Sequence, residues 1–253
     1  MSWPSVLVLG VRVDDLPLEA LLDSFDEVIQ SGGESVFGNV NVHAINLAWD
    51  LPWLRVFLNS CDPVFCDGAG VRLGAWLTGH RLKHRNTIPD WFSVLCERAQ
   101  FKGHSMYFLG SRDGIAAKAA AKVMASLPDL RIVGTHHGYF DHRMDSQDNA
   151  EVVRSINEAS PDILLVAMGM PLQEAWIRDH LHELDAHVIL PVGALLDYVS
   201  GRLRRPPAWM SRNGFEWLGR LIHEPRRLWR RYLIGNPVFL WRILKQRFGS
   251  TDG

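Results

Sequence analysis

The sequence predicts an α/β fold with a doubly wound, mostly parallel (Rossmann-like) sheet and a C-terminal helical appendage. Up to about residue 200, short apolar runs alternate with amphipathic helical patterns, the order expected of a parallel sheet wrapped by helices. Residues 163–168 (ILLVAM) are continuously apolar, as in a strand that helices cover on both faces. Beyond Arg202 the pattern is helical only, so we expect a separate helical part there.

The predicted elements follow the chain in a regular order. Strands are expected at residues 5–13, 36–40, 63–66, 105–109, 131–134, 163–168 and 187–191. Helices are expected at residues 16–30, 44–59 with a bend near Pro52, 71–79, 114–126, 147–159 and 172–184. After Arg202, prolines separate three helical pieces, because proline fixes φ and lacks an N–H. Ligands of doubly wound sheets bind beyond the carboxyl ends of the strands, so the strand-to-helix turns are where chemistry is expected.

The composition is that of a globular protein. The 253 residues are 47% hydrophobic and 22% charged, with a net charge of −1, and these totals do not indicate a nucleic-acid partner. The three cysteines have no CxxC spacing, which favours buried thiols in a reducing compartment over disulfides or a zinc site. We expect no signal peptide, since no basic stretch precedes the first apolar run. No apolar run is long enough to span a bilayer.

The small net charge hides a strong asymmetry along the chain. Residues 202–247 contain twelve Lys and Arg against two Glu, a net charge of +10, which leaves −11 for the rest of the chain. Four of the ten tryptophans also lie in this segment. Charge gathered at one end indicates a second functional unit with an anionic partner. We therefore expect a catalytic α/β domain at residues 1–200 and a basic, Trp-rich appendage at residues 201–253.

The sharpest local feature is the turn Asp67-Gly-Ala-Gly70, which follows a short predicted strand. Gly68 and Gly70 let the backbone approach a ligand closely, and the amides of the next helix point to the same place. A carboxylate at Asp67 is suited to act as a general base there. The alternative is an ordinary N-cap aspartate with turn glycines. Gly68, Gly70 and Gly74 also form GxGxxxG, a weak dinucleotide-binding signal without the usual acidic ribose partner.

Other polar side chains follow strands in the same way. Asn39 and Asn41 come after the second strand, where amides can hold sugar hydroxyls or phosphate oxygens, although asparagine is also a common turn residue. Gln173 and Asp197 follow the last two strands. Arg85 lies in a basic run and is suited to stabilise a diphosphate leaving group. No Asp-x-Asp pair and no HExxH motif occur, and the histidines are interpreted as surface or core residues, so no metal and no cofactor are expected.

Taken together, these turns resemble the WecG/TagA/CpsF family, glycosyltransferase family 26. The resemblance covers residues 6–245, with the motifs in order. They are Asn39-Val-Asn41, Asp67-Gly-Ala-Gly70, Arg85-Asn-Thr-Ile-Pro-Asp90, Tyr107-Phe-Leu-Gly110, Gly138-Tyr-Phe140, Gly169-Met-Pro-Leu-Gln-Glu174, Gly201-Arg-Leu-Arg-Arg-Pro-Pro-Ala-Trp209, Gly214-Phe-Glu-Trp-Leu-Gly-Arg-Leu221 and Glu224-Pro-Arg-Arg-Leu-Trp-Arg-Arg-Tyr232. Three positions depart from the family pattern. Asn39 replaces threonine, Ile88 replaces glycine and Leu172 replaces lysine, near the expected sugar or diphosphate site.

The resemblance implies a function and residue roles. Family members transfer a sugar from a UDP-sugar to a polyprenyl-diphosphate-linked acceptor, with inversion at the anomeric carbon. Asp67 would be the catalytic base. The substrate-binding residues would be Asn39, Asn41, Gly68, Arg85, Gln173 and Asp197, together with some of the tail arginines Arg205, Arg220, Arg227, Arg230 and Arg231. The donor sugar, a hexose or an N-acetylhexosamine such as N-acetylmannosamine, is not fixed by these motifs.

The tail itself favours a membrane partner. Apolar stripes such as Leu228, Trp229, Tyr232 and Leu233 lie beside arginines, which suits a helix at the membrane interface. An alternative is that the stripes pack on the catalytic domain or on a second subunit of a homo-oligomer. We expect a cytoplasmic enzyme, peripheral on the inner face of the bacterial plasma membrane, in surface polysaccharide or teichoic acid biosynthesis. The alternatives are a non-catalytic membrane-binding adaptor and an NADP-dependent oxidoreductase.

Overall fold

A computed structural model describes residues 3–248 of the 253-residue chain. The chain forms two compact units. The first contains the residues up to 18, residues 39–87 and the residues from 204 onward, and the second contains residues 19–38 and 88–203. In this division the C-terminal segment groups with residues 39–87.

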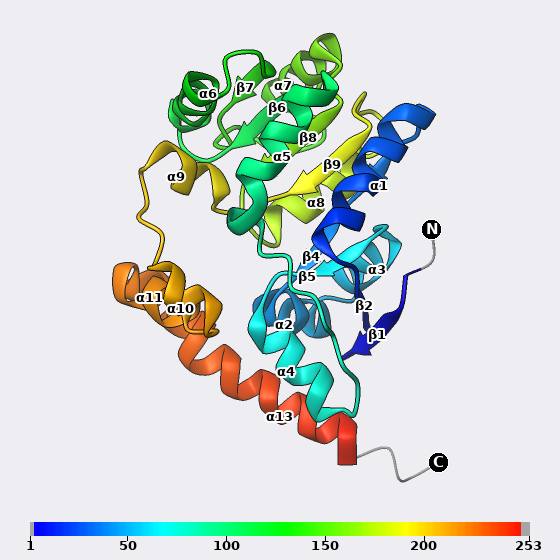
Figure 1. Ribbon diagram of the computed structural model, residues 1–253, viewed down its shortest axis with the longest axis vertical. Coiled ribbons are helices and arrows are strands. Elements are labelled where there is room, and N and C mark those ends of the chain that lie inside the picture. Colours follow the sequence, from blue (N-terminus) through cyan, green and yellow to red (C-terminus); the bar gives the residue numbers. More distant parts are fainter. Residues whose placement is uncertain (1–2, 249–253) are drawn as a thin grey trace. The chain divides into compact units, whose positions relative to one another are not determined.

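The second unit contains a five-stranded sheet in the order β3-β9-β8-β6-β7, in which the pairs β3–β9, β8–β9, β6–β8 and β6–β7 are parallel. Helices flank this sheet (Figure 1). Its strands are β3 (Ser35–Val36), β6 (Ser105–Gly110), β7 (Arg131–His136), β8 (Ile163–Ala167) and β9 (Val188–Pro191), and its helices are α1 (Leu18–Ser31), α5 (Ile88–Lys102), α6 (Ile115–Ser126), α7 (Gln147–Ala159), α8 (Leu172–His180) and α9 (Leu195–Ser200). Every residue of β6, β8 and β9 is buried, as expected for parallel strands covered on both faces.

The first unit contains a four-stranded sheet in the order β1-β2-β5-β4. Its elements are β1 (Ser5–Val8), β2 (Val11–Asp14), β4 (Gly38–Val40), α2 (Val42–Asp50), α3 (Pro52–Ser60), β5 (Val64–Cys66), α4 (Ala69–Leu77), α10 (Ala208–Arg212), α11 (Glu216–His223), α12 (Pro225–Trp229), the π-helical turn η1 (Arg230–Ile234) and α13 (Gly235–Phe248). The predicted α/β fold with parallel strands, flanking helices and a helical C-terminal part is confirmed, although its strands form two sheets.

Two predicted strands are each divided. Residues 5–13 form the antiparallel pair β1 and β2, because Leu9 and Gly10 both have positive φ, as in the tight turns that join hairpin strands. Residues 36–40 contribute to different sheets, since β3 pairs with β9 whereas β4 neighbours β5. The bend predicted near Pro52 is confirmed as the break between α2 and α3, where proline occupies the first turn of α3.

Within the first unit, the C-terminal helix α13 packs against two other helices. α13 contacts α2 and α4 and runs beside α4 in Figure 1, and its Phe239 and Ile243 are buried. A Cβ at Gly74 of α4 would lie 2.6 Å from the Phe239 ring, so the glycine permits this close packing. From Pro225 to Phe248 the chain is helical throughout, with η1 as a π-helical turn. Among the described residues, no helix is both long and apolar enough to cross a membrane.

Candidate active site

Asp67 lies directly after β5, at the carboxyl end of that strand. Its backbone is fixed on two sides, because its N–H donates to the carbonyl of Val40 (2.9 Å) and its carbonyl accepts from Thr87 Oγ1 (2.6 Å). The chain beside it is also held, since Asn86 N–H donates to the carbonyl of Cys66 (2.8 Å). The predicted strand-end position of this carboxylate is confirmed, and its backbone is ordered before any ligand binds.

Asn41 links the carboxylate to helix α2. Its Oδ1 accepts from the N–H groups of His43 (3.0 Å) and Ala44 (3.2 Å), which is an N-cap interaction. Its Nδ2 donates to Asp67 Oδ2 (3.4 Å). A Cβ at Gly68 would lie 3.1 Å from Asn41 Cβ, so this position favours glycine. The cap predicted as the alternative role for Asp67 is not formed, because Gly68 is the N-cap of α4 and no side chain caps that helix; the Asp67 carboxylate faces a cavity.

This catalytic cavity has a volume of about 500 Å³, within the usual range for small-molecule sites. Residues 41–87 supply one part of its wall and the C-terminal helices supply the other. The lining residues are Asn41, Val42, His43, Asp67, Gly68, Ala69, Gly70, Leu73, Arg85, Thr87, Asn213, Gly214, Glu216, Trp217, Arg220, Arg231, Tyr232, Asn236, Phe239 and Leu240. The tail is therefore part of the site itself.

Three arginines line the cavity among the side chains that the structure describes. Arg85 donates from Nη1 to the carbonyl of Ser211 (2.9 Å), which ties the basic run to the tail. Arg220 comes from α11, and Arg231 comes from η1. Arg231 Nε is buried with no hydrogen-bond partner among the described residues. A buried guanidinium nitrogen of this kind is a ready donor to a phosphate oxygen.

The electrostatics of the cavity favour a basic carboxylate at Asp67. Burial raises the pKa of Asp67 to about 6, and the negative charge of Glu216 adds to this rise. The hydrogen bond from Asn41 and the charges of Arg220 and Arg231 oppose it. At pH 7 the carboxylate is therefore mostly ionised, yet it is more basic than an exposed aspartate, as a general base requires.

His43 lies on the same wall. Burial lowers its pKa to about 4, and the charges of Arg231 and Arg220 contribute. His43 is therefore neutral at pH 7 and adds no positive charge to the cavity.

Several predicted binding residues lie outside the lining of this cavity. Asn39 is buried within β4. Arg205 lies 3.7 Å from Glu216 and donates to Ser211 Oγ, so it supports a cavity residue. Arg227 pairs with Glu224 (3.0 Å), and Arg230 lies over the Trp229 ring. Among the tail arginines whose side chains the structure describes, Arg220 and Arg231 line the cavity.

Gln173 and Asp197 belong to the second unit, beyond the carboxyl ends of β8 and β9. Gln173 Oε1 accepts from the N–H groups of Gly169 (3.0 Å) and Gly193 (3.1 Å). Asp197 accepts from Ser111 Oγ (2.5 Å) and Arg202 Nη1 (2.9 Å). Both side chains thus hold strand-end turns together, and their predicted contact with the donor stays a prediction.

Two parts of the cavity lining, Glu216 and the α13 side chains, are not predicted from the sequence. Glu216 received no role, because nothing in its local sequence indicates that it shares a cavity with Asp67. Asn236 and Phe239 of α13 were likewise not selected as site residues. The sequence signal that points to Glu216 is the segment 214–221, which resembles a family motif and contains both Glu216 and Arg220. Among the described residues, no group of three His, Cys, Asp or Glu side chains is arranged to hold a metal ion.

A basic carboxylate beside arginines, at a strand end of an α/β fold, is suited to activating a hydroxyl next to a phosphorylated ligand. The chain belongs to the WecG/TagA/CpsF family of glycosyl transferases, whose sequence model matches residues 6–253. It is thus a glycosyltransferase.

Three relatives illustrate the similarity, and each is named N-acetylglucosaminyldiphosphoundecaprenol N-acetyl-beta-D-mannosaminyltransferase. The protein of Bacillus subtilis (strain 168) is 32% identical, over 75% of this chain and 71% of its own length. That of Bacillus spizizenii is 31% identical, over 79% and 75%. That of Staphylococcus aureus (strain MRSA252) is 24% identical, over 95% and 92%.

Proposed function

We propose that this chain is an inverting glycosyltransferase that transfers an N-acetylmannosamine-type sugar or a glucose from a UDP-sugar to a saccharide carried on a polyprenyl diphosphate. The reaction would belong to the synthesis of a bacterial surface polysaccharide or teichoic acid. The names of the relatives support an N-acetylglucosamine-diphospholipid acceptor and an N-acetylmannosaminyl group.

The observation that carries this proposal is the catalytic cavity, where Asp67 lies with Arg85, Arg220 and Arg231. A reaction between two diphosphate-bearing substrates needs both a base for the acceptor hydroxyl and cations for developing negative charge. The cavity holds both kinds of group within about 500 Å³. Its asparagines and its aromatic side chain at Trp217 are also suited to sugar hydroxyls and sugar rings.

The proposed step is a direct displacement. The acceptor hydroxyl gives its proton to the Asp67 carboxylate while its oxygen forms a bond to the anomeric carbon of the donor. The bond from that carbon to the diphosphate oxygen breaks, and its electron pair leaves with UDP. A positioned base contributes on the order of a hundredfold to ten-thousandfold in such a step.

The arginines would stabilise the leaving diphosphate. Arg231 Nε has a buried N–H without a partner among the described residues, so a phosphate oxygen would satisfy it at no cost in lost protein contacts. Arg85 and Arg220 add two positive charges to the same wall. Guanidinium groups suit this role because they stay charged and bind phosphate oxygens in pairs.

A peripheral position at an anionic membrane fits the acceptor and the tail. The described tail exposes Trp209, Trp229 and Trp241 among its excess of arginines. Exposed tryptophans beside cations are typical of interfacial helices.

The test is transfer from UDP-N-acetylmannosamine to N-acetylglucosamine-diphosphopolyprenol by the native chain and by Asp67→Asn. We expect Asp67→Asn to lose at least about a hundredfold in rate, while the thermal midpoint and the shift caused by UDP are retained. Asp113→Asn is the matched control, because Asp113 is exposed and lies in the second unit. Native-like transfer by Asp67→Asn would contradict the role of Asp67.

A further inference from the structure

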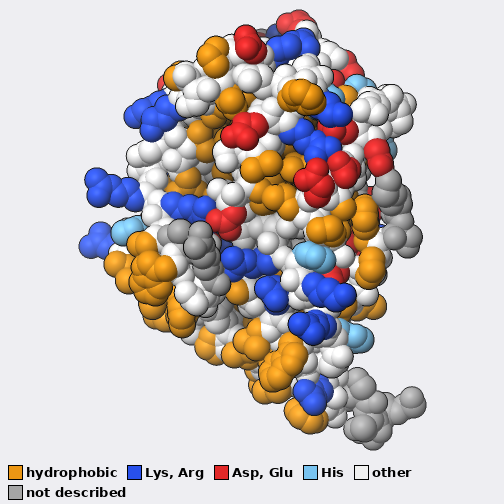
Figure 2. All heavy atoms as spheres, viewed as in Figure 1, with side chains coloured by type: hydrophobic (Ala, Val, Ile, Leu, Met, Phe, Trp, Pro, Cys, Tyr) orange, Lys and Arg blue, Asp and Glu red, His pale blue; other side chains and the backbone are white. Residues whose placement is uncertain are grey.

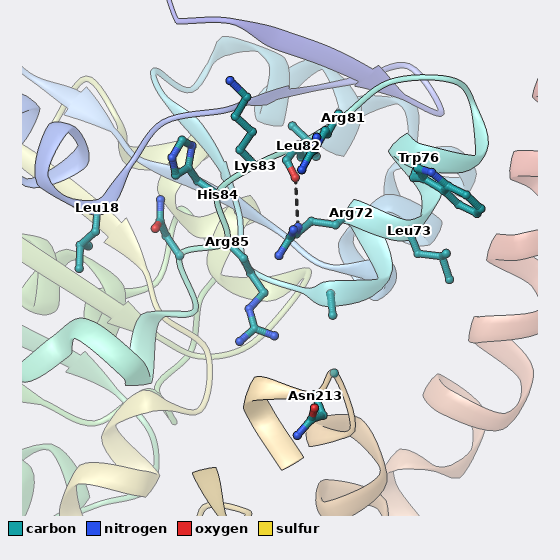
Figure 3. Close-up of a pocket in the computed structure, with 13 residues that line it drawn as sticks. Leu18, Arg72, Leu73, Trp76, Arg81, Leu82, Lys83, His84, Arg85 and Asn213 are labelled. Atoms are coloured by element: carbon teal, nitrogen blue, oxygen red, sulfur yellow. Dashed lines mark hydrogen bonds between the residues drawn. The ribbon is translucent and has the colours of Figure 1, made fainter. Parts of the chain in front are cut away.

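A second concave surface lies beside the catalytic cavity, between α4, the loop at residues 81–86 and the segment that carries Asn213 (Figure 3). We call it the basic groove, and its volume is about 970 Å³. It is lined by Leu18, Ala69, Arg72, Leu73, Trp76, Arg81, Leu82, Lys83, His84, Arg85, Asn86, Asn213 and Gly214. All of these residues belong to the first unit.

The basic groove gathers positive charge. Arg72, Arg81, Lys83 and Arg85 line it, and none of its described lining residues is an Asp or Glu. Within residues 3–248, no carboxylate forms an ion pair with any of these four side chains. Cations held near one another repel unless an anion lies between them. The charge pattern therefore points to an anionic ligand.

The loop that carries these cations is held in place by the protein. Asp15 Oδ1 accepts from the N–H groups of Lys83 (2.9 Å) and His84 (2.8 Å), and from His84 Nδ1 (3.0 Å). Arg72 Nε donates to the carbonyl of Leu82 (3.1 Å), the dashed contact in Figure 3. Asp15 thus fixes the backbone of Lys83 and His84 and the His84 ring. It does not neutralise the long side chains of the arginines and the lysine that line the groove. The groove is formed before any ligand arrives.

Apolar side chains border the cations on the same helix. Leu73 is 45% exposed and Trp76 is 66% exposed, and in Figure 3 both extend to the opposite side of α4 from the Arg72 guanidinium. α13, which packs on α4, exposes Trp241, with Lys245 lying over its ring. Figure 2 shows hydrophobic side chains interleaved with Lys and Arg along the surface formed by α13. Exposed aromatic residues beside cations match the chemistry of a membrane interface.

We propose that the basic groove binds the phosphate headgroups of anionic phospholipids, with Leu73 and Trp76 entering the membrane interface beside it. This inference rests on the peripheral membrane position proposed above and extends the membrane-binding surface beyond the tail to α4 and residues 81–83. A free nucleotide would leave Leu73 and Trp76 exposed to water, whereas a lipid surface covers them and pairs the cations.

The groove and the catalytic cavity share lining residues, namely Ala69, Leu73, Arg85, Asn213 and Gly214. Headgroups held in the groove would therefore place the membrane surface beside the catalytic cavity. A lipid-anchored acceptor could then reach Asp67 without its diphosphate leaving the interfacial region.

The experiment measures binding of the full chain to vesicles of phosphatidylcholine with and without phosphatidylglycerol, by co-sedimentation at low salt. The test variant is Arg81→Ser/Lys83→Ser, since both side chains are exposed and neither lines the catalytic cavity. We expect about 30-fold weaker binding to the anionic vesicles, as roughly 1 kcal/mol per cation implies. The matched control is Lys118→Ser/Arg154→Ser, which removes the same two charge types from exposed positions of the second unit and should bind as the native chain does.

A second variant and a second substrate separate the alternatives. Trp76→Ser should also weaken vesicle binding, and both variants should transfer at the native rate to a short-chain, water-soluble acceptor without vesicles. Native vesicle binding by Arg81→Ser/Lys83→Ser would overturn the inference. A loss on the soluble acceptor that matches the loss on vesicles would also overturn it, because the groove would then bind a substrate diphosphate. Vesicle binding is measured without substrates, so the inference can hold or fail independently of the proposed transfer reaction.

Discussion

At the scale of single residues, the proposed chemistry depends on the Asp67 carboxyl, which must be more basic than an exposed aspartate and still ionised at pH 7. Burial and Glu216 raise its pKa to about 6, while Asn41 and two arginines limit the rise. A lower pKa would weaken the base, and a much higher one would leave it protonated at pH 7. Glu216 is itself held by Ser211 Oγ (2.7 Å), so its charge has a fixed place in the cavity.

This balance predicts a pH dependence. The proposed mechanism requires ionised Asp67, so the rate should fall as the pH drops through about 6, the pKa of this carboxyl. Glu216→Gln removes a negative charge that raises this pKa, so the acidic limb of the pH–rate profile should move to lower pH by roughly half a unit to one unit. The measurement is kcat/KM between pH 4.5 and 8.

Glu224→Gln is the control, because Glu224 lies in the same tail, pairs with Arg227 and does not line the cavity. Its profile should match the native one. An unchanged profile in Glu216→Gln would show that Glu216 does not tune Asp67.

At the scale of elements, the contact between α4 and α13 joins the tail to the site. Gly74 is approached by Phe239 and Ile243, and Phe239 also lines the cavity. The packing of these two helices therefore sets the position of one cavity wall. The π-helical turn η1 in the same helical run carries Arg231, in line with the frequent occurrence of π-turns at functional sites.

Adding volume at Gly74 should displace α13. Gly74→Ala should destabilise the chain slightly and Gly74→Leu by about 1–3 kcal/mol, the usual effect of overpacking, with a loss of transfer activity in both. Thermal unfolding and the transfer rate provide the measurements. Phe239→Leu in the Gly74→Ala background should recover part of the stability, since it removes the ring that the new Cβ meets. Additive losses in the double variant would contradict this contact.

At the scale of the whole molecule, functions are distributed by unit. The first unit carries the catalytic cavity, the basic groove and the tail, and the second carries the parallel sheet with Gln173 and Asp197. The charge asymmetry of the sequence follows this division in part, because both the tail and the cations of residues 72–85 belong to the first unit.

Much of this organisation could be predicted from the sequence, because local patterns determine it. The buried strands β6, β8 and β9 and the Asp67-Gly68 turn lie where the sequence predicts them, whereas the predicted strands 5–13 and 36–40 are each divided. Helix α5 was not predicted, although its buried residues Trp91, Phe92 and Leu95 recur at helical spacing. Glu216 could not be assigned, since its proximity to Asp67 arises from tertiary packing between segments distant in sequence. The same reason explains why three of the proposed tail arginines, Arg205, Arg227 and Arg230, do not line the cavity.

The central claim is that one base, Asp67, drives a direct displacement at the anomeric carbon. The most direct test is the anomeric configuration of the product, determined by NMR after transfer from an α-linked UDP-sugar to the diphospholipid acceptor. A single displacement inverts the configuration of the anomeric carbon, so the native chain should give a β-linked product. An α-linked product would contradict it, because retention requires a different mechanism from one base acting on the acceptor hydroxyl.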